Sequence, residues 1–289
     1  ALSWTGEALM ETQASHTGNV TTHDRFLLGE DWTHRALGEH ASVASFSAFS
    51  IALMTNQAPS DLVNDALKAG LDEVRHAKVS FDIASRLSGK EVGPGPLPPS
   101  SHEFGHDLKA LALAVAREGC VDETLSAFAA AVEVEHINEV LEMGMQETLY
   151  SNIGRDMLTL IRDELVTIAM DESNHSALAW RTLGWVCGVD SNACDSVYTD
   201  VFEESHLEMR FKQRADSSFG KELAVLSSMR GEWTKIFNAH QVAHSDADEK
   251  PVTESICKKA DIAEVWGDES GQSLLTSVTE NVLRQVLCR

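Results

Sequence analysis

The chain has 289 residues, 43% of them apolar, which is enough to bury a core in one large domain or in one domain with an appendage. Its 45 acidic residues outnumber the 23 basic ones, and the formal net charge of −22 repels phosphate backbones and anionic lipid head groups. Nucleic acid and membrane surfaces are therefore excluded as expected partners. A run of the ~18 apolar residues that a membrane-spanning helix needs is missing as well, so we expect a soluble protein.

The N-terminal part carries few structural signals. The residues up to about Phe26 are polar and lack a sustained period, so we expect residues 1–30 to form a segment that covers the surface. The chain starts at Ala1 without a methionine and without a basic-then-apolar leader, which is compatible with a targeting peptide that has been removed. The compartment stays open. Five scattered cysteines are too few for a disulfide framework and leave room for one or two bridges and one thiol.

Helical periodicity dominates the rest of the chain, and no window alternates in the manner of a half-buried strand, so the fold is expected to be all-α. A first helix is predicted from residue 31 to about 54, before a proline and polar cluster at 56–60. A second is predicted over 61–87 and ends at a serine and a glycine. Residues 89–106 hold four of the six prolines, which indicates a long crossing connection between two helix pairs.

Two further long helices are expected after this connection. Helical character resumes near residue 107 and continues to about 149, where the break at 151–154 follows. The fourth helix is predicted over 155–185. Residues 31–188 are thus predicted to form a four-helix bundle.

The C-terminal part is predicted less sharply. Residues 189–243 are expected to form additional helices that pack on the bundle, over 196–214 and 221–240. Residues 244–289 are expected to be a polar linker followed by a helical segment from about 264 to 287.

Two segments share the pattern Asp-Glu-x-x-His, at 72–76 in the second expected helix and at 171–175 in the fourth. A glutamate and a histidine three apart lie on one helix face, so both side chains can reach one ion. Two such pairs that face each other across a bundle supply most of a dinuclear site. The candidate ligands are Glu73, His76, Glu172 and His175. The preceding Asp72 and Asp171 are placed to accept the ring N–H of a histidine on the neighbouring helix.

Such a site also needs one carboxylate from each of the other two helices. Glu39 lies 34 positions before Glu73, the separation expected when two antiparallel helices of some five turns meet at one level. A lone Glu-x-x-His is in most cases only a solvated helix face. The second copy, the place of Glu39 and the crossover connection together favour a dinuclear metal site.

The third helix offers two glutamates, Glu118 and Glu123, inside an otherwise apolar stretch. We prefer Glu118, with Glu123 as the second choice or as an additional ligand. Both lie farther from the second motif than the 34 positions of the first pair, at 54 and 49 positions from Glu172. Either the helices run past the site or the chain breaks between about 126 and 150. Spacing alone favours the region 133–139 as the source of the ligand.

At these residues the chain resembles the ferritin-like proteins with dinuclear carboxylate centres, which include rubrerythrins, ribonucleotide reductase small subunits and bacterial multicomponent monooxygenases. The closest resemblance is to poorly characterised ferritin-like domain proteins. It is carried by EHASVASF at 39–46, LDEVRHAKVSFDIASRLSGKEVGPGPLP at 71–98, AREGCVDETLSAF at 116–128 and IAMDESNHSALAWRTLGW at 168–185. The resemblance implies iron ligands at Glu39, Glu73, His76, Glu172 and His175, and one more glutamate from the third helix. It implies dioxygen or peroxide as the reactant and leaves the substrate open.

A carboxylate-rich site with two imidazoles favours two iron ions, with manganese as the second choice, whereas zinc would bring no redox chemistry. The expected function is a di-iron oxidoreductase that oxidises a small organic molecule. A ferroxidase or iron-handling protein, with Fe(II) as its substrate, would use the same ligands. A non-catalytic helical interaction protein with a vestigial site is the third alternative. An electron-donor protein and a homodimer stay open as further partners.

Overall fold

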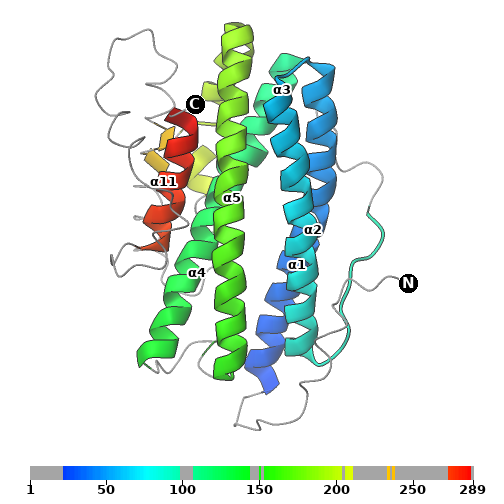
Figure 1. Cartoon of the computed structure of the whole chain (residues 1–289), viewed down its shortest axis with the longest axis vertical. Coiled ribbons are helices and arrows are strands. Elements are labelled where there is room, and N and C mark those ends of the chain that lie inside the picture. Colours follow the sequence, from blue (N-terminus) through cyan, green and yellow to red (C-terminus); the bar gives the residue numbers. More distant parts are fainter. Residues whose placement is uncertain are drawn as a thin grey trace. The chain divides into compact units, whose positions relative to one another are not determined.

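The computed structural model describes residues 22–97, 107–143, 150, 153–203, 206–210, 233–234, 236–237 and 273–287. Every regular element within these residues is helical, which confirms the all-α prediction. The elements in chain order are α1 (Thr22–Thr55), α2 (Ser60–Ser88), α3 (Leu108–Ala114), the π-helix η2 (Val115–Glu123), α4 (Thr124–Met143), α5 (Arg155–Val189), α6 (Ser191–Asp200) and α11 (Leu274–Leu287) (Figure 1).

The N-terminal helix is longer than predicted. Helix α1 begins at Thr22, whereas the polar sequence had indicated a surface segment up to residue 30. Leu28, Trp32 and Ala36 recur every fourth residue and are almost completely buried, so one face of this first part belongs to the core. Phe26 and Leu27 next to this row are apolar but exposed, so the buried row does not stand out in the sequence. Residues 1–21 lie outside the described residues.

Helix α2 follows the prediction closely. It ends at Ser88, and Gly89 adopts a positive φ of 69°, the left-handed conformation that commonly terminates a helix. Residues 91–97 of the predicted crossover form no regular element, and its remainder, 98–106, lies outside the described residues.

The third predicted helix is not one uniform α-helix. It consists of α3, the π-helix η2 and α4, because the hydrogen bonding widens to the i→i+5 pattern between Val115 and Glu123. The continuous helix predicted over 196–214 is wrong in its first part, since α6 ends at Asp200. Most of 221–240 and all of 244–272 lie outside the described residues.

The chain divides into two compact units, of which unit 1 comprises Ala1–Ile51, Ala66–Glu103 and His136–Leu165. Within it α1 and α2 run side by side in opposite directions (Figure 1). Arg25 near the start of α1 donates to the carbonyl of Arg86 near the end of α2, and Phe46 near the end of α1 lies against Gly70. The two helices share a core cluster that consists of Ala36, Ala77 and Phe81, with Val92 packed against it.

Unit 2 comprises Ala52–Asp65, Phe104–Glu135 and Val166–Arg289. Here η2 and the start of α4 run antiparallel to α5. Gly119 lies close to Ala179, and Thr124, farther along the chain, contacts the earlier residue Ser176. Helix α11 lies along α5 (Figure 1) and buries the apolar residues Leu274, Leu275, Val278, Val282 and Leu283. Helix α3 packs against α6.

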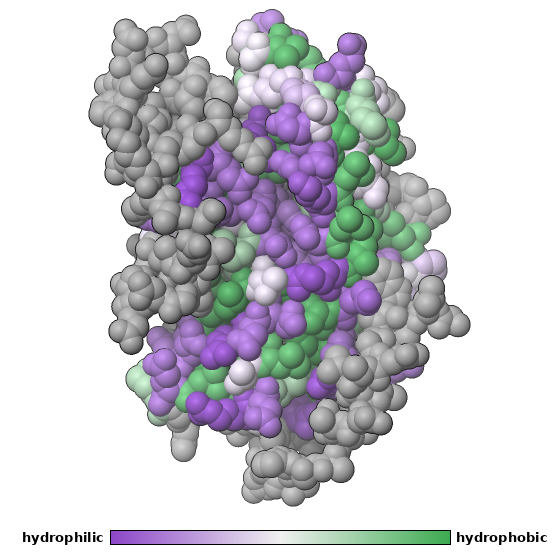
Figure 2. Space-filling model, viewed as in Figure 1, coloured by the Kyte–Doolittle hydropathy of each residue, from purple (hydrophilic) through white to green (hydrophobic). Residues whose placement is uncertain are grey.

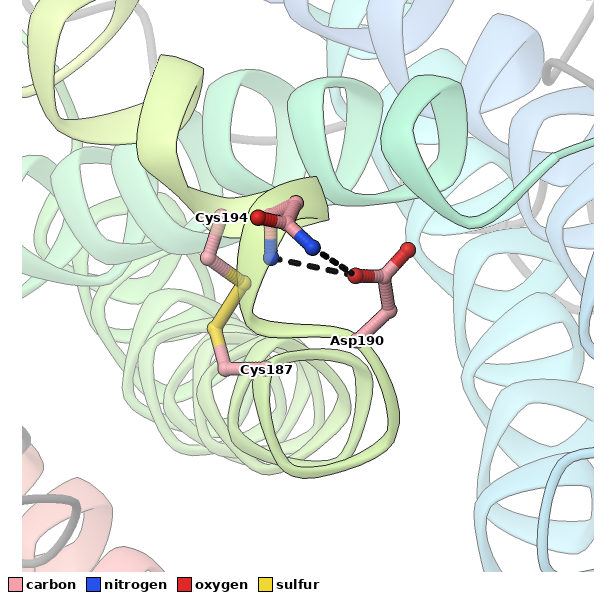
Figure 3. The surroundings of a disulfide bond; sticks show 4 residues. Cys187, Asp190 and Cys194 are labelled. Atoms are coloured by element: carbon pink, nitrogen blue, oxygen red, sulfur yellow. Dashed lines mark hydrogen bonds between the residues drawn. A yellow bond between two sulfur atoms is a disulfide. The ribbon is translucent and has the colours of Figure 1, made fainter.

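A disulfide between Cys187 and Cys194 ties the end of α5 to α6, with the two Cα atoms 5.5 Å apart. Asp190 caps α6 inside this loop, where its carboxylate accepts from the backbone N–H and the side-chain amide of Asn192 (Figure 3). The thiol of Cys120 is buried, and burial raises its pKa well above the usual value, which keeps it unreactive at neutral pH. Cys257 and Cys288 lie outside the described residues.

We expect the double substitution Cys187→Ala/Cys194→Ala to lower the free energy of unfolding by about 2–3 kcal/mol, because a bridge over a short loop restricts the unfolded chain. Urea denaturation of oxidised protein, compared with the double variant, measures this difference. Treatment with a thiol reductant should lower the midpoint of the parent chain and leave that of the double variant unchanged. Equal midpoints for the oxidised parent and the variant would show that the bridge contributes nothing.

None of the helices in the described part of the chain combines the length and the apolar character needed to cross a membrane. On the face seen in Figure 2, hydrophilic residues repeatedly interrupt the hydrophobic ones.

Candidate metal centre

The first motif forms a triad with a glutamate from the neighbouring helix. Glu73 and His76 stand one turn apart on the same face of α2, and Glu39 reaches them from α1. Nδ1 of His76 lies 3.7 Å from Oε2 of Glu73 and 3.8 Å from Oε2 of Glu39. The side chains of His76, Glu73 and Glu39 are 0%, 1% and 13% exposed.

The second motif repeats this arrangement. Glu172 and His175 stand one turn apart on α5, and Glu123 reaches them from the end of η2. Nδ1 of His175 lies 3.7 Å from Oε2 of Glu172 and 3.8 Å from Oε2 of Glu123. The side chains of His175, Glu172 and Glu123 are 2%, 4% and 17% exposed. The two triads therefore match in residue type, spacing, distances and burial.

These distances suit ligands of a common ion better than hydrogen bonds. A hydrogen bond between nitrogen and oxygen spans about 2.7–3.2 Å, so 3.7–3.8 Å is too long for one. Nitrogen and oxygen ligands lie about 2.0–2.2 Å from a first-row metal ion, so two of them are separated by about 3 Å at a right angle and about 4.2 Å when opposite. The observed separations fall inside this interval, and each triad can accommodate an ion.

The ligand atoms form two groups in which all members lie within 4.8 Å of one another. The first group consists of Glu39, Glu73, His76 and Glu172, and the second of Glu73, Glu123, Glu172 and His175. Glu73 and Glu172 thus belong to both groups. Such a buried set of carboxylates and imidazoles can hold a metal ion.

The two glutamates of the third predicted helix differ in position. Glu123 belongs to the second group, whereas Glu118, the residue preferred from the sequence, belongs to neither. Burial raises the pKa of Glu118, the nearby Asp122 carboxylate raises it further, and Arg210 lowers it. The preference for Glu118 rested on its place in the segment that carries the resemblance, between small and apolar residues. It took no account of the i→i+5 bonding in η2, which changes the direction of the side chains relative to an α-helix.

The long separation between Glu123 and Glu172 has a simple origin. Helix α4 continues from Thr124 to Met143, and α5 begins at Arg155, well before Glu172. Both helices therefore run past the triad, and these extra turns account for the long separation in sequence. This is the first of the two explanations that the spacing had left open. In the region 133–139, Nδ1 of His136 lies 3.8 Å from Oε2 of Glu139, and these two residues belong to neither group.

Helix α11 contacts the second motif from outside, which the sequence had not indicated. The side-chain amide of Asn281 donates to Oγ of Ser173 at 2.6 Å and to Oδ1 of Asn174 at 2.9 Å. Gln285 donates to the same Oδ1 of Asn174 at 2.7 Å. Ser173 and Asn174 are the two residues between Glu172 and His175, so α11 holds the turn that carries both ligands. The only sequence signal is an Asn and a Gln four apart on one helix face.

The aspartates that precede the motif glutamates are half-buried. Their role in fixing the histidine rings stays a prediction, as does the identity of any bound metal. No family model, curated protein or solved structure matched the chain when it was compared with each.

Proposed function

We propose that the chain is a ferritin-like di-iron protein, an oxidoreductase that uses dioxygen or peroxide to oxidise a small organic molecule. The observation that carries the proposal is the pair of equivalent triads with Glu73 and Glu172 common to both groups. Glu73 and Glu172 belong to both groups, so each of them would be available to either of two ions held there.

Charge supports two ions rather than one. The two groups together contain four glutamates and two histidines. Four carboxylates and two neutral imidazoles balance two divalent cations, whereas the same carboxylates buried without cations would be costly. Oxygen-rich ligation with imidazole suits iron first and manganese second.

The protein residues have defined tasks in this proposal. Each histidine presents Nδ1 to its glutamates, so with an ion bound at Nδ1 the ring proton would be on Nε2. The near-complete burial of both rings keeps water away from these nitrogens and strengthens the local electrostatics. With iron bound, the centre would supply the electrons that reduce dioxygen.

Iron handling is the second candidate, and one observation favours it. Glu39 and Glu123 are the most exposed members of the two triads, at 13% and 17%. An Fe(II) ion can therefore meet a carboxylate before it reaches a buried histidine. In that case Fe(II) is the substrate, and the same residues serve as a ferroxidase centre.

A titration of metal-free protein with Fe(II) under anaerobic conditions, followed by exposure to dioxygen, tests the proposal. We expect two Fe(II) per chain to bind and to remain bound after oxidation, with further dioxygen uptake only when a reductant is added. Oxidation of many Fe(II) ions per chain without a reductant would identify a ferroxidase. Fewer than one metal ion per chain would contradict both functions and leave the non-catalytic helical protein.

A further inference from the structure

A hydroxyl pair adjoins the second triad. Thr124 directly follows Glu123 in the chain, and Ser176 directly follows His175. Both residues are completely buried, and Oγ1 of Thr124 lies 2.6 Å from Oγ of Ser176. The pair therefore joins the segment that carries Glu123 to the helix that carries His175.

The direction of the hydrogen bonds follows from the third partner. Oγ1 of Thr124 also lies 2.6 Å from the carbonyl oxygen of Cys120, which can only accept. The Thr124 hydroxyl therefore donates to Cys120, and its oxygen accepts from the Ser176 hydroxyl. Each hydroxyl proton thus takes part in one hydrogen bond. A chain of hydrogen bonds runs from Ser176 on α5 through Thr124 to the backbone carbonyl of Cys120 in η2.

This chain lies where the π-helix ends. In an α-helix the backbone N–H of Thr124 would bond to the carbonyl of Cys120, four residues earlier. Instead this N–H bonds to the carbonyl of Val121, and the Thr124 hydroxyl takes the carbonyl of Cys120. The side chain thus replaces a backbone hydrogen bond at the junction between η2 and α4.

We propose that Thr124 and Ser176 are positioning residues that hold the end of η2 in register, so that Glu123 points to Nδ1 of His175. Without the pair, η2 can relax toward an α-helix, and a shift of one residue turns a side chain by about 100° around the helix axis. Glu123 then leaves the second triad, whereas Glu39, Glu73 and His76 are unaffected. The inference rests on the proposed dinuclear centre.

A buried hydroxyl that only stabilises its own helix should not affect metal binding. Helix α11 contains such a hydroxyl, which serves as a control for Thr124. Thr279 on α11 is equally buried and donates to the carbonyl of Leu275, four residues earlier in its own helix. Its replacement by valine removes a buried hydroxyl without touching η2. Thr279→Val is therefore the control for Thr124→Val, and Thr124→Ser, which keeps the hydroxyl, is the rescue.

The experiment is a titration with Mn(II), in which electron paramagnetic resonance counts the free ion. We expect the parent chain, Thr124→Ser and Thr279→Val to bind two Mn(II) alike. In Thr124→Val and in Ser176→Ala one ion should bind as in the parent and the other about 10- to 100-fold more weakly. The double variant should be no worse than either single variant, because both break the same chain.

The outcomes separate the two proposals. Two ions in the parent and unchanged affinities in Thr124→Val and Ser176→Ala would overturn the positioning role alone. An equal loss in Thr279→Val would overturn it as well, since the effect would then be general destabilisation. Fewer than two Mn(II) per parent chain would overturn the dinuclear centre together with the role of the pair. Should Thr124→Val fail to fold, Ser176→Ala decides the question alone.

Discussion

Replacement of Glu73 by glutamine is expected to abolish the binding of both metal ions and to stabilise the metal-free protein. Glu73 belongs to both ligand groups, so its loss removes an oxygen from each ion. In the metal-free chain the same carboxylate repels its buried neighbours, and a neutral amide can donate to them instead. We expect the free energy of unfolding of metal-free protein to rise on the order of 1 kcal/mol.

The matched control is Glu133→Gln, because Glu133 is also buried but belongs to neither group. Metal analysis after anaerobic loading with Fe(II) should give two ions per chain for this control and less than one for Glu73→Gln. Urea denaturation with and without metal gives the two stabilities. A Glu73→Gln variant that still holds two ions would contradict the role of Glu73 as a shared ligand.

Gly119→Ala is expected to lower the free energy of unfolding by about 1–3 kcal/mol and to weaken metal binding at the second triad. A Cβ at position 119 would overlap with Cβ of Ala179, a methyl group that cannot rotate away. The backbone of η2 must therefore move from α5, and it carries Glu123 away from His175. Glycine at this position is required by the close approach of the two helices.

Two variants separate this contact from an ordinary helix effect. Gly188→Ala changes a glycine of α5 with nothing within 4 Å of the new Cβ, and it should be neutral or stabilising by about 0.5–1 kcal/mol. Ala179→Gly in the Gly119→Ala background removes the opposing methyl and should restore metal affinity. The contact between residues 119 and 179 would be excluded as the cause by either of two results. One is a loss of stability in Gly188→Ala equal to that in Gly119→Ala, and the other is unchanged metal affinity after Ala179→Gly is added to Gly119→Ala.

Much of the fold could be predicted because helical periodicity and terminating residues are local signals. The end of α2 at Ser88 follows from the glycine that comes next, which adopts the left-handed conformation. The start of α1 could not be found, because the exposed apolar residues Phe26 and Leu27 mask the buried row that contains Leu28. Helix α6 ends at Asp200, after which Val201 leaves the helical conformation and is buried together with Phe202, and the local pattern did not indicate this end.

Part of the candidate metal site could likewise be predicted from local sequence signals, and part could not. The pairing of Glu73 with His76, and of Glu172 with His175, follows from a spacing of three on one helix. The choice of Glu123 over Glu118 could not be made, because a π-helix alters the register without a known sequence signal. The contacts of Asn281 with the second motif join residues more than one hundred positions apart, and such contacts depend on the tertiary fold.

The proposed dinuclear centre requires two metal ions beside His76 and His175, with Glu73 and Glu172 available to both. Anomalous scattering at the iron edge, recorded from a crystal of protein loaded with Fe(II), tests it most directly. We expect two peaks a few ångströms apart, each within bonding distance of Nδ1 of one histidine. A single peak, or peaks away from these nitrogens, would rule out the dinuclear centre.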